Sequence, residues 1–287
     1  LIIPESPKKT EVEEVEEIDE SSSERDSVRP TSTIIVGVPK DGVEPNPFVA
    51  YLNSLQSKDA ASQNSLAEFQ AMNPNYNNIH VSHPITKYIE SMLTSGESRH
   101  VVLTGHAGDG KSTVAIEIYK LLNDISPDHT LNTPLQPREN IKSGRTTISL
   151  IKDFSEWSPS DRSDLMREML DSNGPHFLLV SNTGTLLDTF KNHSIAHDGS
   201  WLEIESRLLT TMDQSEPIDM DYLGMAFTVI NIANMDNLGI GELIFDRMLA
   251  EERWNACAHA DCHIGCPIFS NITLMKANKS IVRERIF

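Results

Sequence analysis

Residues 100–123 read HVVLTGHAGDGKSTVAIEIYKLLN, and this stretch decides the fold. Residues 100–104 are a short run of apolar and β-branched side chains, which predicts a strand that Gly105 interrupts. From Val114 onward, apolar side chains recur at helical spacing, so we predict a helix of about three turns that ends near Asn123. Between these two elements, residues 105–112 match the pattern G-x-x-x-x-G-K-S in the strand–loop–helix context that gives the pattern its meaning.

The residue types in this loop are those that cradle a phosphate group. Glycines let consecutive backbone N–H groups curl around a phosphate without a Cβ in the way, and the N-terminus of the next helix adds the positive end of its dipole. We predict that Lys111 reaches the β- and γ-phosphates of a nucleoside triphosphate and that the Ser112 hydroxyl binds Mg²⁺. The candidate nucleotide-binding residues are Gly105, His106, Ala107, Gly108, Asp109, Gly110, Lys111, Ser112 and Thr113.

Hydrolysis also requires a carboxylate near the Mg²⁺ and a group that orients the attacking water. The predicted strand at 146–151 is followed by Lys152 and Asp153, so Asp153 is the candidate magnesium ligand beside Ser112, and Glu156 is the candidate catalytic base. The alternative for Asp153 is that it caps a turn before Glu156. Only about forty residues separate the loop lysine from Asp153, which leaves little room for a strand that many such folds place between them.

Two further polar positions are candidates for sensing the γ-phosphate. Asn182 follows the predicted strand at 176–181, where P-loop ATPases of the additional-strand type carry an Asn that senses this phosphate and helps to hold the water. The alternative is an Asn that turns the chain ahead of Gly184. Arg283 and Arg285 lie at the start of a late helix, where such folds often place a sensor arginine, and the alternative is that both are ordinary surface residues. The candidate catalytic residues are Lys111, Asp153, Glu156 and Asn182.

Strands and helices alternate along most of the chain. Besides the strands named above, we predict one at 226–233, and a helix that starts at Pro159 and ends at Asn173-Gly174. This alternation favours an α/β fold, the three-layer sandwich of P-loop NTPases, in which helices cover both faces of a mostly parallel sheet. We expect a P-loop NTPase domain at 85–287, incomplete at the C-terminus, preceded by a small N-terminal helical segment at 34–84.

Composition excludes several classes of protein. Of the 287 residues, 38% are apolar and 23% are charged, which excludes a wholly disordered chain. No apolar run is long enough for a membrane helix and no signal peptide is legible, so we expect a soluble, cytoplasmic protein. The net charge of −18 argues against a broad DNA-binding face, so DNA would be held by partners or by other regions. Residues 1–33 hold ten acids and four bases, which predicts a disordered acidic linker.

The three cysteines lie within ten residues of one another, at Cys257, Cys262 and Cys266. In a cytosolic chain such a cluster favours a metal site over a disulfide, with His259 or His263 as a fourth ligand for Zn²⁺. The spacing C-x₄-C-x₃-C is not a standard zinc-finger spacing. An iron–sulfur cluster with an external ligand and plain reduced thiols are the alternatives.

The quoted motifs resemble, in their form and order, the DptF-like ATPases of phosphorothioation-dependent DNA restriction in bacteria. The resemblance covers roughly residues 80–287 and is carried by the sequences VVLTGHAGDGKS at 101–112, IKDFSE at 151–156, FLLVSNTG at 177–184, and the stretch from Cys262 to Asn271. It implies an Mg²⁺-dependent ATPase within a bacterial defence complex that acts on DNA lacking a protective sulfur modification, with other subunits of that complex as partners and a homo-oligomer as a further option. The alternative function is a signalling NTPase switch that controls the oligomerisation of an attached effector.

Overall fold

The computed structural model describes residues 46–55, 67–95, 99–144, 146–171, 174–196, 201–260 and 264–287. The acidic linker predicted at 1–33 lies outside these residues, as do the first residues of the segment that begins at position 34. Residues 39–287 group into one compact unit. The fold described below belongs to that unit.

A six-stranded sheet lies at the centre of this unit, with the strand order β2-β3-β4-β1-β6-β5. The strands are β1 (Arg99–Thr104), β2 (Arg138–Ser143), β3 (Thr146–Ile151), β4 (His176–Val180), β5 (Ile218–Tyr222) and β6 (Met225–Asn231). The four inner strands are parallel, with Val102 opposite Leu179 of β4 and Val229 of β6, whereas the edge strands β2 and β5 run antiparallel to their neighbours. The four predicted strands and the mostly parallel sheet are therefore confirmed, and the two edge strands are additions to the prediction.

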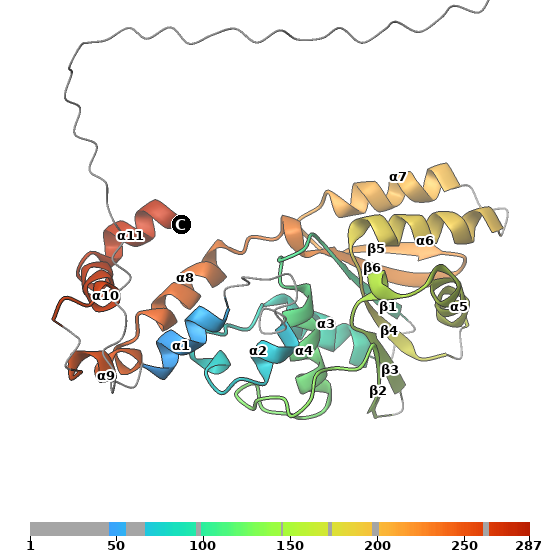
Figure 1. Cartoon of the computed structure of the whole chain (residues 1–287). Coiled ribbons are helices and arrows are strands. Elements are labelled where there is room, and N and C mark those ends of the chain that lie inside the picture. Colours follow the sequence, from blue (N-terminus) through green and yellow to red (C-terminus); the bar gives the residue numbers. More distant parts are fainter. Residues whose placement is uncertain are drawn as a thin grey trace, which may run out of the picture. The chain divides into compact units, whose positions relative to one another are not determined.

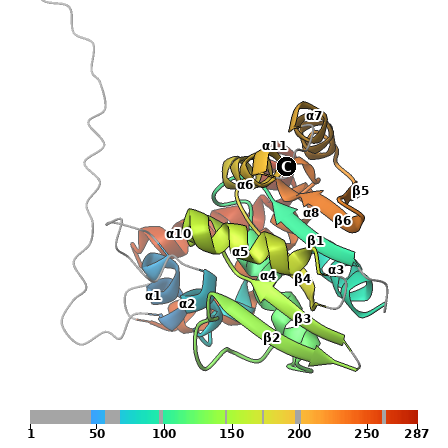
Figure 2. The same cartoon turned by 90° about the vertical axis from the view of Figure 1, so that its right-hand side faces the viewer.

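Helices pack on both faces of the sheet because the side chains of each inner strand alternate between the faces. On one face, Val101 and Leu103 pack with α3 (Ile85–Thr94) and α4 (Lys111–Leu122). On the other face, Val102 packs with α5 (Pro159–Met169), α6 (Thr183–Ala196) and α7 (Trp201–Met212). Figures 1 and 2 show these two groups of helices on opposite sides of the strands. The arrangement is compatible with a three-layer sandwich.

The predicted helix boundaries follow from local capping. Asn123 is the C-cap of α4, as predicted. The α5 helix begins with Pro159 after Ser158, whose hydroxyl accepts a hydrogen bond from the backbone N–H of Asp161, as an N-cap does. Of the Asn-Gly pair predicted to end that helix, Asn173 lies outside the described residues.

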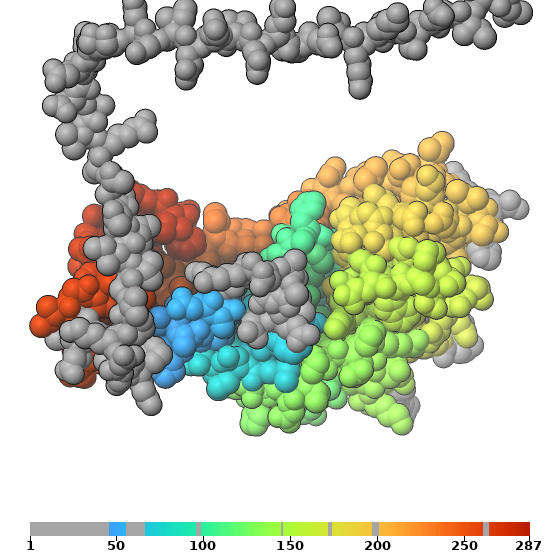
Figure 3. Space-filling model, in the orientation of Figure 1, coloured from blue at the N-terminus to red at the C-terminus, as the bar shows by residue number. Residues whose placement is uncertain are grey.

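The N-terminal helices α1 (Pro47–Ser54) and α2 (Ala67–Ala71) pack within the same compact unit as the sheet. The Phe48 ring of α1 meets the Trp254 ring edge-on at 5.6 Å, and Ile79 packs against the same cluster. Figure 3 shows the surface of α1, in blue, directly beside the cyan surface that follows it in the chain. Ala71 at the end of α2 is fully buried in the core beside α4, and its carbonyl accepts a hydrogen bond from Leu131 N.

The C-terminal part of the unit is helical, with α8 (Leu238–Met248), α9 (Asn255–Ala258), α10 (Pro267–Ala277) and α11 (Lys279–Ile286). Three short 3₁₀ turns lie at η3 (Phe154–Glu156), η4 (Ile232–Asn234) and η5 (Glu251–Arg253), and a fourth, η2 (Tyr76–Asn78), precedes α3. Arg283 pairs with Glu242 at 2.7 Å and with Asp246 at 3.8 Å, which ties α11 to α8. In the described part of the chain, no helix is both long and apolar enough to cross a membrane.

Candidate functional site

The loop between β1 and α4 has a backbone that only glycine adopts readily. Gly105, Gly108 and Gly110 have φ values of +150°, +91° and +91°. A Cβ added at Gly105 would lie 2.9 Å from both Asp109 Oδ2 and Ile232 Cγ2. Gly110 is the left-handed residue that precedes the first turn of α4. The strand–loop–helix predicted from the sequence is therefore present, and its glycines stand where the backbone requires them.

Two charged side chains of this region bind the loop itself. Lys111 Nζ donates to the carbonyl oxygens of Gly105 at 3.1 Å and His106 at 2.6 Å. The carboxylate of Asp109 accepts a hydrogen bond from the backbone N–H of His106. Partial burial lowers the pKa of Lys111, and the charges of Asp109 and Asp153 oppose this shift. The lysine ammonium is thus held at the loop by carbonyl oxygens, which an anion could replace.

A cavity of about 430 Å³ opens on this loop. Asp153 follows β3 and Asn182 follows β4, and both line the cavity because β4 lies between β1 and β3 in the sheet. Ligands of open α/β sheets bind in the crevice outside the carboxyl ends of the strands. The lining residues are Ala67, Gln70, Ala107, Gly108, Gly110, Lys111, Ser112, Thr113, Asp153, Ser155 and Asn182. The fold thus brings together six of the residues predicted from the loop and two predicted from the strand ends.

Asp153 and Asn182 also make the local contacts that were the alternatives for them. Asp153 Oδ1 accepts a hydrogen bond from Ser155 N at 2.8 Å and so caps η3. Asn182 Oδ1 accepts a hydrogen bond from Thr185 N at 2.8 Å in the first turn of α6, and Asn182 N donates to Ser155 Oγ at 3.2 Å. These contacts fix the orientation of both side chains at the edge of the cavity. Asp153 and Asn182 therefore each make a local turn or helix-start contact and also line the cavity.

The remaining predicted residues of this site lie elsewhere. Glu156 is exposed on η3 and does not line the cavity. His106 is exposed and Gly105 is buried beneath the loop, and neither lines the cavity. Arg283 pairs with acids of α8, and Arg285 is exposed on α11. Two polar side chains that sequence reasoning missed, Gln70 and Ser155, do line the cavity.

A second cavity, of about 470 Å³, adjoins the other side of the loop. It shares Gln70, Gly108, Gly110 and Thr113 with the first cavity. Its other walls are Asp109 of the loop, which was among the predicted residues, the segment between Tyr76 and His83, part of α4, and the start of α8 together with Ile232. His83 Nε2 lies 2.9 Å from Asn237 Oδ1, which joins the segment to the start of α8. No sequence signal marked this cavity, because its walls come from parts of the chain that are far apart.

The predicted zinc site is only partly within the described residues. Cys257 and Cys266 are half-buried free thiols, and Cys257 Sγ accepts a hydrogen bond from Asn46 Nδ2 at 3.1 Å. His259 is exposed, whereas Cys262 and His263 lie outside the described residues. Within the described ranges, no group of three or more His, Cys, Asp or Glu residues could hold a metal. Zinc at this cluster therefore stays a prediction.

Comparisons of the chain with protein-family models, with curated proteins and with solved structures give no match.

Proposed function

We propose that this chain binds a nucleoside triphosphate with Mg²⁺ at the loop 105–110 and hydrolyses it. The observation that carries the proposal is the convergence, in one cavity, of the glycine loop, Lys111, Ser112, and the polar residues that follow β3 and β4. A positive helix N-terminus, a lysine ammonium and strand-end polar groups form an arrangement that favours a polyanion and a divalent cation.

The phosphate groups would replace the contacts that the loop now makes with itself. Lys111 would exchange the carbonyl oxygens of Gly105 and His106 for phosphate oxygens, which are stronger acceptors because they are charged. The loop amides and the first turn of α4 would bind the same phosphates. Together these groups would stabilise the charge that develops on the transferred phosphoryl group.

Ser112 and Asp153 are the residues that would hold Mg²⁺, since a hydroxyl and a carboxylate are the hard oxygen ligands that this ion prefers. When bound, the ion would neutralise negative charge on the phosphate oxygens. Asn182, whose Oδ1 accepts a hydrogen bond from Thr185 N, would orient the γ-phosphate or the attacking water. Glu156 would have to move to act as a base, so we assign the positioning role to Asn182 and the adjacent Ser155 hydroxyl.

The nucleoside would occupy the second cavity, which begins at Gly108 and Gly110 and continues between the segment 76–83 and α8. This cavity presents apolar walls at Ile79 and Ile240, which suit the faces of a base. We propose ATP as the preferred nucleotide, and a role in a DNA-restriction complex, on the strength of the motif resemblance alone. Because α8 forms one wall and is tied to α11, nucleotide binding would also bear on the position of the C-terminal helices.

The proposal is tested by nucleotide binding and steady-state hydrolysis with the whole chain. We expect the variants Lys111→Ala and Asp153→Asn to lose turnover, with Lys111→Ala also weakening nucleotide binding. Lys142→Ala is the matched control, because Lys142 is exposed on β2 opposite the start of β3 and makes no contact with either cavity. Equal binding and turnover in the Lys111 and Lys142 variants would refute the proposal.

The same assay, run with and without DNA, separates the two functions that the sequence suggests. A strong increase in turnover when DNA is added supports a restriction motor. Slow turnover that DNA does not change, with nucleotide retained through purification, supports a nucleotide-dependent switch instead.

A further inference from the structure

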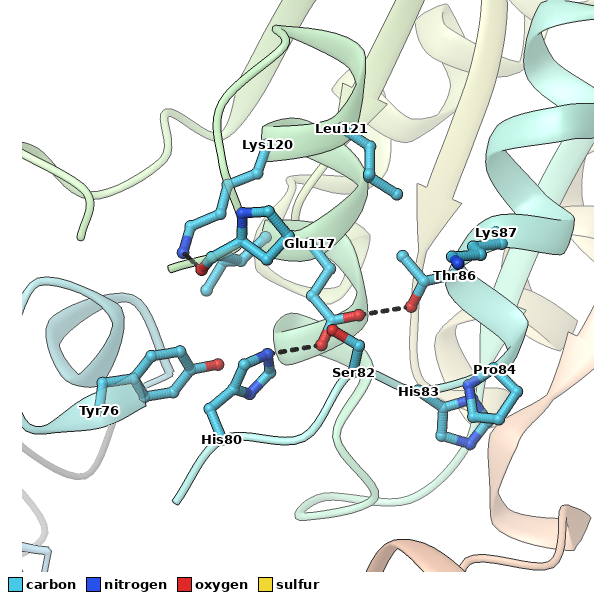
Figure 4. A pocket seen from close by; sticks show the side chains of 12 residues that line it. Tyr76, His80, Ser82, His83, Pro84, Thr86, Lys87, Glu117, Lys120 and Leu121 are labelled. Carbon is cyan, nitrogen blue, oxygen red and sulfur yellow. Dashed lines mark hydrogen bonds and ion pairs between the residues drawn. The ribbon is translucent and has the colours of Figure 1, made fainter. Parts of the chain in front are cut away.

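A third cavity, of about 410 Å³, lies against α4 and adjoins the second cavity, with which it shares Tyr76, His80, His83 and Glu117. Its walls are residues of the segment from Tyr76 to Lys87, four positions of α4 and Pro127 in the loop after α4, and no residue of the loop 105–110 lines it. Figure 4 shows its side chains around the carboxylate of Glu117. The lining residues are Tyr76, His80, Ser82, His83, Pro84, Thr86, Lys87, Ile116, Glu117, Lys120, Leu121 and Pro127.

The carboxylate of Glu117 is held by two side chains of the protein. Its Oε2 accepts a hydrogen bond from Thr86 Oγ1 at 2.6 Å, and its Oε1 lies 2.8 Å from His80 Nε2. Both contacts are drawn in Figure 4. Because Glu117 is 6% exposed, these partners replace the water that the carboxylate loses on burial. The acid therefore builds the wall of the cavity; its Oε2 is hydrogen-bonded, whereas its Oε1 lies beside His80 but has no hydrogen-bond partner among the described residues.

Two hydrogen-bond donors in this cavity also have unused capacity. Tyr76 is 5% exposed, and among the described residues its hydroxyl has no hydrogen-bond partner. Burial, with the charge of Glu117 as the next cause, raises the pKa of Tyr76, so the phenol keeps its proton and can donate it. A buried hydroxyl without a partner is costly, which points to an acceptor that the protein itself does not supply.

Lys120 is the second such donor. This lysine is 2% exposed, and its Nζ donates to the carbonyl of Pro127 at 3.0 Å and lies 5.9 Å from the centre of the Tyr76 ring. An ammonium group has three N–H donors, and the described contacts give a carbonyl partner to one of them. Lys87, which is exposed at the cavity, adds a second positive charge. Two lysines against one glutamate make this lining net positive in a chain whose net charge is −18.

Much of the remaining wall is apolar, beside the polar side chains of Ser82, His83 and Thr86. Ile116, Leu121, Pro84 and Pro127 line the cavity, and the Tyr76 and His80 rings stack at 4.5 Å with an angle of 18° between their planes. Such a wall favours a flat, apolar ligand body. We propose that this cavity is a binding site for a small organic anion, in which an acidic head accepts hydrogen bonds from Tyr76 and Lys120 and a planar apolar body lies against the apolar part of the wall.

The test uses three probes that share one planar body: 2-naphthoate, 2-naphthyl phosphate and the uncharged 2-naphthamide. Binding to the whole chain is measured by calorimetry. We expect one or both anions to bind at least about tenfold more tightly than the amide, because a charge-assisted hydrogen bond exceeds a neutral one. The tighter of the two anions identifies the head group as a carboxylate or a phosphate.

Matched variants localise the binding. Tyr76→Phe keeps the ring stack and removes the hydroxyl, and Lys120→Met keeps most of the side-chain volume and removes the charge. We expect them to weaken anion binding by about 10-fold and about 10- to 100-fold. The controls are Tyr88→Phe, on the exposed side of α3, and Lys191→Met, which is exposed on α6. Lys111→Ala should bind the anions as the wild type does, since Lys111 does not line this cavity.

Three results would overturn the proposal: no binding of either anion, equal binding of anion and amide, or an affinity that Tyr76→Phe leaves unchanged. Loss of anion binding in Lys111→Ala would also overturn it, by moving the site to the phosphate-binding loop. Tyr76→Phe keeps the test decisive if Lys120→Met fails to fold. The measurement does not depend on nucleotide hydrolysis. Tyr76 also lines the cavity proposed for the nucleoside, whereas Lys120 does not, so weaker anion binding in Lys120→Met assigns the anion to the third cavity apart from the proposed function.

Discussion

Replacing Gly105 with alanine should destabilise the protein more than any other glycine-to-alanine change in the loop. The φ of +150° lies in a region that residues with a Cβ rarely adopt, which costs on the order of 1–3 kcal/mol. The added Cβ would also meet Ile232 Cγ2 and Asp109 Oδ2, each at 2.9 Å. Ile232 is 1% exposed and cannot move into solvent, so overpacking adds about 1–3 kcal/mol. We expect Gly105→Ala to lower the free energy of unfolding by about 2–6 kcal/mol.

Two matched substitutions separate these two costs. Gly108 has a φ of +91° and nothing within 4 Å of an added Cβ, so Gly108→Ala should cost only the backbone part, about 1–2 kcal/mol. Gly239 lies in the first turn of α8 with open space around it, so Gly239→Ala should leave stability unchanged or raise it by up to about 1 kcal/mol. Urea unfolding followed by circular dichroism measures all three. If Gly105→Ala is as stable as Gly108→Ala, the reasoning about contact with Ile232 is wrong.

Three further predictions concern buried or charged side chains. Burial lowers the pKa of His100 to about 4 from its usual 6.5, so the unfolded chain binds this proton more readily than the folded chain does. Urea unfolding should therefore show the full contribution of His100 to stability above pH 6.5 and a loss of about 3 kcal/mol as the pH falls toward 4. The same loss in His100→Gln would contradict this assignment. Thr86→Val should cost about 1–3 kcal/mol of unfolding free energy, since it removes the 2.6 Å hydrogen bond to the buried Glu117 carboxylate, and a thermal midpoint equal to that of the wild type would count against it. Asp109→Asn keeps an acceptor for the backbone N–H of His106 and removes a negative charge from the loop. Nucleotide titration should therefore show tighter binding than in the wild type. Weaker binding would show that the negative charge itself is required.

Most of the sheet could be predicted from the sequence, and the exceptions have a common cause. The inner strands β1, β3, β4 and β6 are buried on both faces, so each reads as a continuous apolar and β-branched run. The edge strands β2 and β5 are exposed on one face, and their sequences RENIKS and IDMDY carry many charged residues. Each of these edge strands exists because the adjacent strand offers it a hydrogen-bonding edge, and that information is not local to its own residues.

The candidate site divides in the same way. The glycine loop was legible because each of its requirements is local: a strand, a backbone of positive φ, and a helix that begins at Lys111. That Asp153 and Asn182 face this loop depended on the strand order, which follows from how the helices pack. Glu156 shows the limit, since the turn at η3 leaves it exposed only three residues after Asp153.

The sequence by itself determined the glycine loop between a strand and a helix, the four parallel strands and the acidic character of the chain. Only the tertiary structure decided that Gln70 and Ser155 line the loop cavity, and that Tyr76 and Lys120 line another cavity against α4. The physical reason is the distance along the chain over which each feature is determined. Backbone conformation and hydrophobic periodicity are set by neighbours along the chain, whereas a cavity is set by which distant side chains the packed core brings into contact.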